Sequence, residues 1–348
     1  MNTSKVPAGR LKPKLIRATL VVFISFSIIS LFSVFPDPFP NFLLGVVSLS
    51  IPLLALVNFI LCTWFIYRRS WWFAAFASIV PIIVFFWSGL FSVIDREENF
   101  EPSFGLVTYN TDQLIDSVTR ADYRNDFVKW VNERQFDVLC LQEVIELKDD
   151  TFRIAGYKKV FSGKPTSRTE HFGIALFTRL PMINSGTVEF GAPSFNRLVW
   201  ADVLFDNDTI RIATVHLKSY NFQHNSVRGN IRRLKDGIIY RTWHAKMTKE
   251  FIEKSPYPVV LCGDFNEPTH SYSYRVISKG LNSAFNVSGD IFDYTFFLKG
   301  MPIRIDHILT SPELRTKDFE ITHGLKWSDH SPVSVRIGWQ AQASRKRR

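Results

Sequence analysis

The distribution of charged residues divides the chain into two unlike parts. Residues 18–35, 42–67 and 73–94 contain no charged residue, over lengths of 18, 26 and 22 residues. A helix rises about 1.5 Å per residue and a bilayer has a hydrocarbon core about 30 Å thick, so each segment is long enough to cross a membrane. Beyond residue 100, apolar residues occur in short runs between polar ones. The pattern predicts three transmembrane helices within residues 18–96 and a globular domain over residues 100–340.

The globular part contains seven short runs that are rich in branched and aromatic residues and predict strands. They are residues 138–141, 173–178, 198–204, 210–216, 258–262, 305–309 and 333–337. Apolar residues at helical spacing predict helices over residues 112–135 and 234–254, and a basic, polar loop is expected at 221–233. The composition therefore indicates a mixed α/β domain with many strands.

Positive charges flank the apolar segments unevenly. Five lie in the basic tail formed by residues 1–17, none lies between the first two segments, and Arg68 and Arg69 follow the second. Cytoplasmic loops of membrane proteins carry an excess of Lys and Arg. We therefore expect an integral membrane protein with a cytoplasmic N-terminus and the globular domain on the extracytoplasmic side. A cleaved signal peptide, for the first segment, and a buried helical core, for all three, are the alternatives.

The formal net charge of +10 is concentrated at the two ends of the chain. From residue 101 onward there are 34 Lys and Arg against 28 Asp and Glu, and four of these cations lie in the basic C-terminal tail, residues 341–348. A long nucleic-acid duplex requires several cations that contact phosphates, so the nearly neutral body weakens that interpretation without excluding it.

Several apolar runs of the globular part end in polar residues. The segment VVLCGDFNEP, residues 259–268, brings Asp264 and Asn266 to the same side of an extended chain because they are two residues apart. The other runs and motifs are LVTYN at 106–110, VLCLQE at 138–143, IATVH at 212–216, RIDH at 304–307 and SDHSP at 328–332. Carboxylate and amide oxygens at strand ends suit a hard cation or a water bound beside a phosphate.

This ordered set of motifs resembles the endonuclease/exonuclease/phosphatase superfamily of DNase I-like, metal-dependent phosphodiesterases, over residues 104–338. Each motif is weak alone, but their common order makes the resemblance specific. The resemblance implies a four-layered α/β/β/α sandwich with the site at one edge. It implies that Asn110, Glu143 and Asp329 bind metal, and that the catalytic residues are His216, Asp264, Asn266, Asp306 and His330.

The resemblance also assigns roles to these residues. Asp264 would orient or deprotonate water, His216 would donate to a phosphate oxygen, and His330 would act as base or charge stabiliser while Asp306 fixes its tautomer. Whether Asp264 or His330 takes the proton stays open. Arg168, His171 and Arg197 lie in segments that face substrate in relatives, although solvated charges are the simpler interpretation.

Several acidic groups in one pocket require a compensating cation. All-oxygen ligands favour Mg²⁺ or Mn²⁺, and one ion or two stays open. We expect a membrane-anchored, metal-dependent hydrolase that cleaves a phosphodiester of nucleic acid by in-line attack of an activated water. A lipid phosphodiesterase of the sphingomyelinase type, acting on a lipid head group, and a catalytically inactive membrane-bound binding protein are the alternatives. The sequence indicates no obligate protein partner.

Overall fold

The computed structural model describes residues 13–87, 100–115, 119, 121–148, 151–191, 195–220, 226–285, 293–298 and 300–340. The predicted C-terminal tail, the first twelve residues of the N-terminal tail and the end of the third apolar segment from residue 88 lie outside the described residues.

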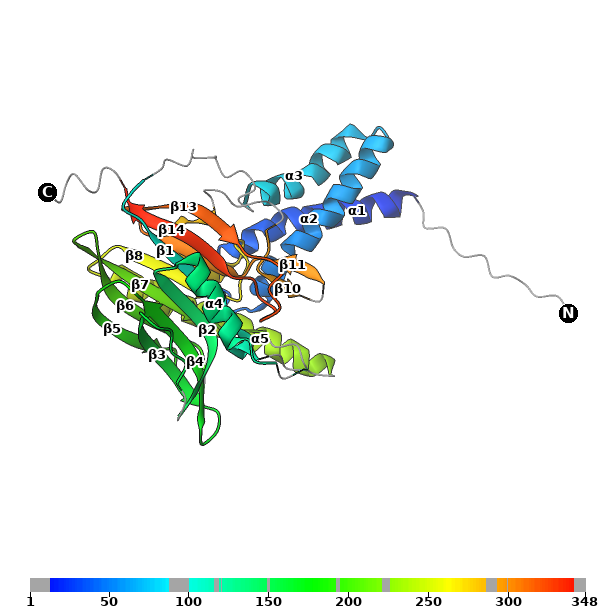
Figure 1. Ribbon diagram of the computed structural model, residues 1–348. Helices are drawn as coiled ribbons and strands as arrows, with labels where there is room; N and C mark the ends of the chain where they lie inside the picture. The colour runs from blue at the N-terminus through cyan, green and yellow to red at the C-terminus, as the bar shows by residue number, and fades with distance from the viewer. Residues whose placement is uncertain are drawn as a thin grey trace.

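The globular domain contains two six-stranded sheets that pack face to face (Figure 1). The first has the order β13-β14-β1-β2-β4-β3 and the second β5-β6-β7-β8-β12-β9. The strands of the first are β1 (Phe104–Asn110), β2 (Val138–Leu147), β3 (Lys158–Pro165), β4 (Glu170–Thr178), β13 (Leu314–Ile321) and β14 (Val333–Trp339). Those of the second are β5 (Met182–Glu189), β6 (Arg197–Phe205), β7 (Asp208–His216), β8 (Val259–Asp264), β9 (Asn282–Ser283) and β12 (Asp306–Thr310). The strands β10 (Phe296–Leu298) and β11 (Met301–Ile303) form a separate hairpin.

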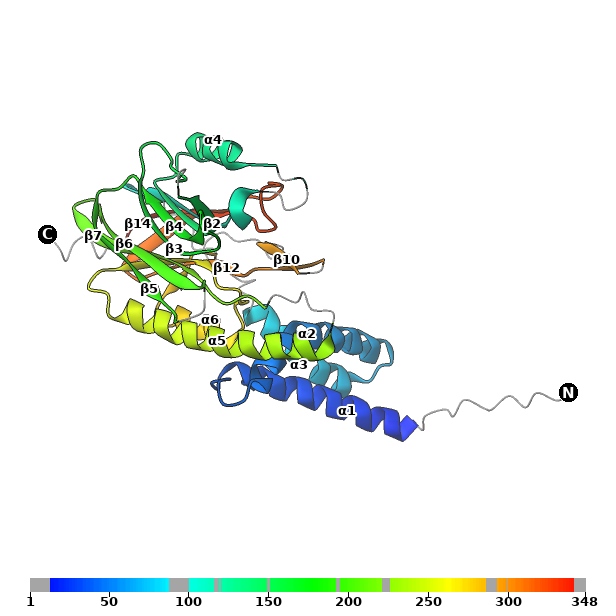
Figure 2. The same ribbon diagram turned by 90° about the horizontal axis from the view of Figure 1, so that it is seen from below.

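Alternation along the strands produces the layers. On β7, Ile210 and Ile212 point into the core between the sheets, whereas Ala213 and Val215 point to the outer face. Helix α4 (Arg124–Arg134) covers the outer face of the first sheet, and α5 (Val227–Glu253) and α6 (Tyr272–Ser278) cover that of the second (Figure 2). The α/β class and the two packed sheets are as predicted, with helices on both outer faces.

Both predicted helices of the domain are present, but each begins at a different residue from the one that the apolar spacing predicted. The helix predicted over 112–135 is regular only from Arg124, because Asp112, Gln113 and Leu114 have left-handed φ values of 39°, 69° and 56°. The helix predicted from residue 234 begins at Val227, so the expected loop is wrong from that point. Ser226 caps it, with its Oγ accepting from the Gly229 N–H at 3.0 Å.

The N-terminal part forms three apolar helices, α1 (Pro13–Ser30), α2 (Leu43–Tyr67) and α3 (Trp71–Trp87). By length and composition, the helical stretches Ile16–Val34 and Leu43–Tyr67 can cross a membrane, whereas Trp71–Phe86 is shorter. The prediction of three spans is thus supported for two of them. The criterion is length and composition alone, and the core helix of a soluble protein or a signal sequence can also meet it.

A buried histidine makes the stability of the domain depend on pH. His244 on α5 packs against the Phe190 ring at 4.6 Å between centroids, and burial, aided by the charge of Arg241, lowers its pKa to about 3. As the pH falls from about 6.5 towards 3, the unfolded chain takes up a proton that the folded chain excludes, so stability is lost over that interval.

We expect His244→Phe to reduce the loss of stability between pH 7 and pH 5, by at most about 1.4 kcal/mol per pH unit. Unfolding of the detergent-solubilised chain at several pH values gives the slope of the unfolding free energy against pH. The exposed His323 supplies the control, and His323→Phe should keep the slope of the parent chain. Equal slopes for His244→Phe and the parent chain would contradict this account.

Candidate active site

One row of residues across the second sheet is polar although it faces the inter-sheet core. The registers Arg197↔His216, His216↔Asp264 and Asp264↔Asp306 place these four residues side by side on adjacent strands. Neighbours in such a row have Cβ atoms about 4.5–5.5 Å apart. Further from this edge the inner positions are aliphatic, for example Ile212 on β7 and Val260 on β8, with the buried Thr214 between Ile212 and His216. The sheet therefore changes from core to candidate site at one edge.

The first sheet contributes Asn110 and Glu143 to the same edge. The Asn110 Nδ2 group donates to Glu143 Oε1 at 3.2 Å and to Asp264 Oδ2 at 3.0 Å. Between them, the Gln142 Nε2 group donates to Thr108 Oγ1 at 3.1 Å and to Thr214 Oγ1, across the two sheets, at 2.8 Å. Gln142 thus ties the sheets together directly beside the site.

A β-bulge turns Glu143 towards the cluster. Strict alternation would place Glu143 and Gln142 on opposite faces. The register between β2 and β4 shifts between Leu141 and Val144, and Glu143 has a left-handed φ of 56°. The Thr111 hydroxyl donates to the carbonyl of Gln142 at 3.0 Å and to that of Glu143 at 3.2 Å, which holds the bulge.

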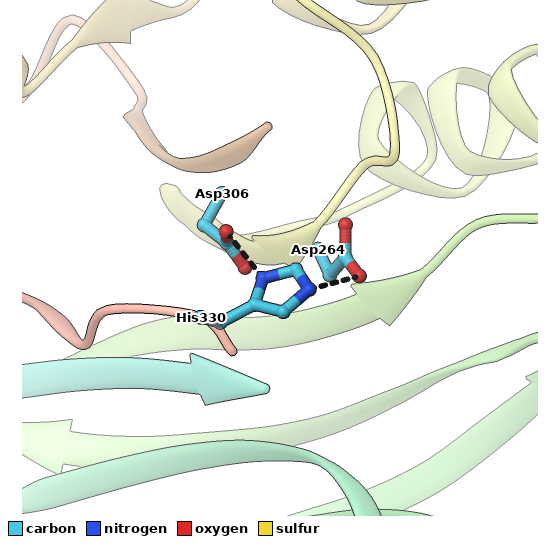
Figure 3. Close-up of side chains that lie close together, drawn as sticks. All are labelled: Asp264, Asp306 and His330. Carbon is cyan, nitrogen blue, oxygen red and sulfur yellow. Dashed lines mark hydrogen bonds and ion pairs between the residues drawn. The ribbon is translucent and has the colours of Figure 1, made fainter. Parts of the chain in front are cut away.

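Asp264, Asp306 and His330 form the buried centre of the cluster (Figure 3). The His330 ring lies between the two carboxylates, with Nδ1 2.8 Å from Asp306 Oδ2 and Nε2 3.9 Å from Asp264 Oδ2. One ligand atom from each residue lies within 4.8 Å of the others, a spacing that suits a metal ion when the imidazole is neutral. The Thr295 hydroxyl oxygen accepts from the Asp306 N–H at 3.1 Å and fixes the start of β12.

Burial and mutual repulsion dominate the electrostatics of this centre. Burial and the charge of Asp306 raise the pKa of Asp264, against the attraction of His330 and His216. Burial disfavours the charged form of His330, but Asp306, Asp264 and Asp329 outweigh it and raise its pKa to about 10. At neutral pH His330 is therefore an imidazolium that donates from Nδ1 to Asp306.

The turn after β8 places Asn266 against Asp264. The Asn266 N–H donates to Asp264 Oδ1 at 2.8 Å, and its Nδ2 group donates to Asp264 Oδ2 at 3.0 Å and to the Leu217 carbonyl at 3.1 Å. Gly263 is required before it, because a Cβ there would lie 2.0 Å from the Val215 carbonyl oxygen, and its φ is 135°. The side-chain amide thus orients the Asp264 carboxylate.

His216 completes the cluster. Its Nε2 atom lies 3.6 Å from both Glu143 Oε1 and Asp264 Oδ2. Among the residues that the structure describes, His216 Nε2 and Asp306 Oδ1 are buried without a hydrogen-bond partner. Unpaired polar atoms inside a site indicate a missing ion, water or ligand group. The Glu143 side chain is 26% exposed, so solvent reaches the cluster from this side.

The structure brings all eight predicted site residues to one edge of the sandwich, although their chemical roles remain predictions. They are Asn110, Glu143, His216, Asp264, Asn266, Asp306, Asp329 and His330. Asp329 lies at the exposed rim. His307, beside Asp306, packs on the other face, where its Nε2 atom lies 2.9 Å from the Glu267 carbonyl oxygen.

Sequence reasoning missed a buried ion pair beside the loops that follow β7 and β8. The Arg241 guanidinium on α5 donates from Nε to Glu267 Oε1 and from Nη1 to the Lys218 carbonyl, both at 2.5 Å, and its centre lies 3.5 Å from the centroid of the Tyr220 ring. Lys218 follows His216 and Glu267 follows Asn266, so Arg241 joins the two loops. Only the tertiary contact reveals the partner of Glu267.

Arg197 was interpreted as a solvated charge and is instead buried. Its Nη1 group donates to Ser162 Oγ on β3 at 2.8 Å, which bridges the sheets beside His216. No described residue accepts from its Nη2 group. Burial lowers its pKa. The guanidinium is a second buried donor next to the cluster.

Comparisons with known proteins agree with this geometry. The description "Endonuclease/Exonuclease/phosphatase family" belongs to the family model that matches residues 107–330. No curated protein matches the chain.

Solved structures share the fold at low sequence identity. The D. rerio TDP2 complex with a single-strand DNA product is 18% identical, with a TM-score of 0.53, over 68% of this chain and 100% of that one. The human Nocturnin catalytic domain with bound sulfate is 21% identical, with a TM-score of 0.52, over 69% and 94%. A Leptotrichia buccalis protein of the same family description is 18% identical, with a TM-score of 0.52, over 68% and 100%.

We expect Arg241→Lys to lower kcat on a soluble aryl phosphodiester by about 100-fold with little change in KM, because small displacements of catalytic groups cost that much. Lys keeps the charge but cannot contact both loops. Arg211→Lys is the matched control, since Arg211 forms a similar buried pair with Asp202, at 2.7 Å, at the far end of β7. It should lose stability and keep kcat. Equal kcat losses in the two variants would show that Arg241 serves stability alone.

Proposed function

Because the chain belongs to the endonuclease/exonuclease/phosphatase family, we propose that it is a membrane-anchored, metal-dependent phosphodiesterase. Members of this family are hydrolytic phosphoesterases that generally depend on divalent metal ions. The observation that supports the proposal most is the cluster of Asp264, Asp306 and His330, extended by Glu143 and Asn110 from the other sheet. The reaction is in-line attack of an activated water on a phosphodiester.

The donor set fits a hard divalent cation. Glu143 and Asp329 offer carboxylate oxygens on the accessible side, as Mg²⁺ or Mn²⁺ requires. Asn110, the third predicted ligand, is buried and turns its Nδ2 group to Glu143 and Asp264, while its Oδ1 accepts from the Asp112 N–H at 3.2 Å, so the structure does not place its oxygen as a ligand. The buried Asp264 and Asp306 carboxylates lie behind them, and Asp306 Oδ1 has no partner among the described residues. When bound, the ion polarises the phosphate and offsets the negative charge of the cluster.

The protein groups divide the remaining work. Asp264, oriented by Asn266 and Asn110, accepts the proton of the attacking water, because His330 already carries its proton at neutral pH. His330, held by Asp306, donates from Nε2 to the oxygens that gain charge in the transition state. His216 donates to a non-bridging oxygen of the phosphate.

The arrangement of the helices supports anchoring by three spans. The α1–α2 connection contacts the sandwich, as the ion pair between Asp37 and Lys246 shows. The turn at Arg68 and Arg69 lies at the far end of the helices (Figures 1 and 2). The α1–α2 connection and the sandwich share one side of a membrane only if α3 returns through it. With the positive-inside rule, the N-terminus and this turn are cytoplasmic and the sandwich is extracytoplasmic.

The conserved chemistry of P–O hydrolysis does not identify the alcohol. The fold of a DNA-bound structure such as that of D. rerio TDP2 is compatible with a nuclease, and a lipid phosphodiesterase uses the same kind of site. A catalytically inactive binding protein is the alternative of a different class.

The full chain in detergent micelles tests the proposal on a bis-aryl phosphodiester. We expect turnover with Mg²⁺ or Mn²⁺, loss of turnover with a chelator, and recovery when the metal is restored. If this ester, plasmid DNA and phospholipid all remain intact with every metal, the chain is a binding protein and the proposal is wrong.

We expect Asp264→Ala and His330→Ala each to lower turnover by several powers of ten while the domain stays folded, because each removes a group that acts in the transition state. Circular dichroism and the unfolding midpoint check the fold. His323→Ala, which removes an exposed imidazole near the same segment, should keep the parent rate. Rates near that of the parent chain for Asp264→Ala would refute the assignment.

A further inference from the structure

The apolar helices join the sandwich at four contacts near the α1–α2 connection. Lys246 pairs with Asp37, the Arg275 guanidinium lies 3.9 Å from the centroid of the Phe35 ring, and Lys235 Nζ lies 5.7 Å from that of Phe42. Gly45 packs so closely on Ile238 that a Cβ there would lie 2.6 Å from Cγ2. The partners in the sandwich belong to α5 and α6. The three apolar helices α1, α2 and α3, called the anchor below, therefore pack on the helical layer that covers the second sheet.

The anchor extends on the side where the candidate site opens. In both Figure 1 and Figure 2, α1, α2 and α3 run outward on the side of the β10–β11 hairpin and the N-terminal end of α5. The strands β1, β2, β7 and β8 end at this edge in Asn110, the Gln142–Glu143 bulge, His216 and Asp264. A bilayer crossed by α1 and α2 therefore faces the edge that contains the candidate site.

Exposed apolar side chains surround this edge. On the first turns of α5, Val227 is 78% and Ile231 53% exposed, and on the β10–β11 hairpin Phe297 is 49% and Met301 60% exposed. Single exposed apolar residues are ordinary, but these lie on two separate segments at one edge. Arg228 and Arg232 are exposed beside Val227 and Ile231. A helix with adjacent basic and apolar side chains is typical of segments that lie in a membrane interface.

The hairpin is also part of the catalytic framework. The Phe296 ring lies 4.8 Å from the His330 ring, centroid to centroid, and the Ser331 N–H donates to the Thr295 carbonyl at 2.7 Å. Thr295 in turn fixes Asp306 through its hydroxyl. The segment whose tip is apolar is thus bonded to the residues that would perform the hydrolysis.

We propose that this edge rests on the bilayer crossed by the anchor, and that the substrate is a phosphodiester of a membrane lipid. The proposal rests on the proposed function. The water oxygen bonds to phosphorus as one ester P–O bond breaks, and the leaving oxygen takes up a proton. A lipid phosphodiester thus becomes a phosphomonoester and an alcohol without a further reactant. The nearly neutral body, which offers few cations for a long polyanion, agrees with a lipid rather than a nucleic acid.

The full chain, reconstituted with Mg²⁺ into vesicles of phosphatidylethanolamine and phosphatidylglycerol, tests this proposal. We expect release of phosphorylated or alcohol head-group products from these lipids. The double variant Val227→Asp/Ile231→Asp should lower that release by about tenfold or more, because two apolar side chains no longer enter the interface. Hydrolysis of a soluble bis-aryl phosphodiester should change by less than about twofold.

The matched control is Ile183→Asp/Leu204→Asp. These side chains are also exposed and apolar. They lie where β5 begins and β6 ends, near the pair Met182 and Val203, which is the end of these strands far from the candidate site. This control should match the parent chain on both substrates.

Three results would overturn the proposal. Hydrolysis of the bis-aryl ester without any lipid hydrolysis would keep the proposed function and exclude a lipid substrate. If single-stranded DNA were then hydrolysed, the chain would be a nuclease. Equal losses for the two double variants would remove the contact at α5. Hydrolysis of neither ester would remove the proposed function as well.

A measurement without turnover tests the contact itself. With Cys62 replaced by Ala and a fluorophore on Ile231→Cys, spin-labelled lipids should quench the emission, whereas a fluorophore on Ile183→Cys should remain unquenched. Absence of quenching at residue 231 would overturn the proposal even if the aspartate variants fail to fold.

Discussion

The structure depends on keeping several ionisable groups compensated in a place where water is largely excluded. Asp264, Asp306 and His330 lie at the edge of two sheets whose shared core is mainly apolar. A lone charge there would be costly, so each group is held by another. The imidazolium of His330 offsets Asp306, and the amides of Asn110 and Asn266 donate to Asp264. Each buried group therefore depends on its neighbours for compensation, and this dependence fixes the positions of the groups relative to one another.

Much of this arrangement could be predicted from the sequence, because strand alternation and motif order are local properties. His216 and Asp264 end strands and Asp306 begins one, each in phase with buried inner positions of its own strand, so their common face follows from period-two geometry. Glu143 is different. Its direction depends on a bulge with a left-handed φ, which alternation cannot indicate. The resemblance to a family supplied its role, and the residue pattern alone did not.

Features that depend on distant contacts could not be predicted. Arg241 and Glu267 are 26 residues apart and meet only because α5 packs over the loops after β7 and β8. Arg197 looked like a surface charge, because its contact with Ser162 comes from the other sheet. The early start of α5 was missed because its first turns are exposed and mostly polar, with Val227 and Ile231 outside the buried apolar stripe of the helix. Tertiary packing and a capping serine determine these residues instead.

The order in which the site residues occur along the chain has a consequence for biosynthesis. Asn110 ends the first strand, and His330 lies just before the last, which pairs with the first in antiparallel register. A nascent chain has neither a complete first sheet nor the imidazole until almost all of the domain has been made. The candidate site is therefore completed late, by the last segments of the domain. A precursor that is still being synthesised lacks the assembled cluster of Asp264, Asp306 and His330.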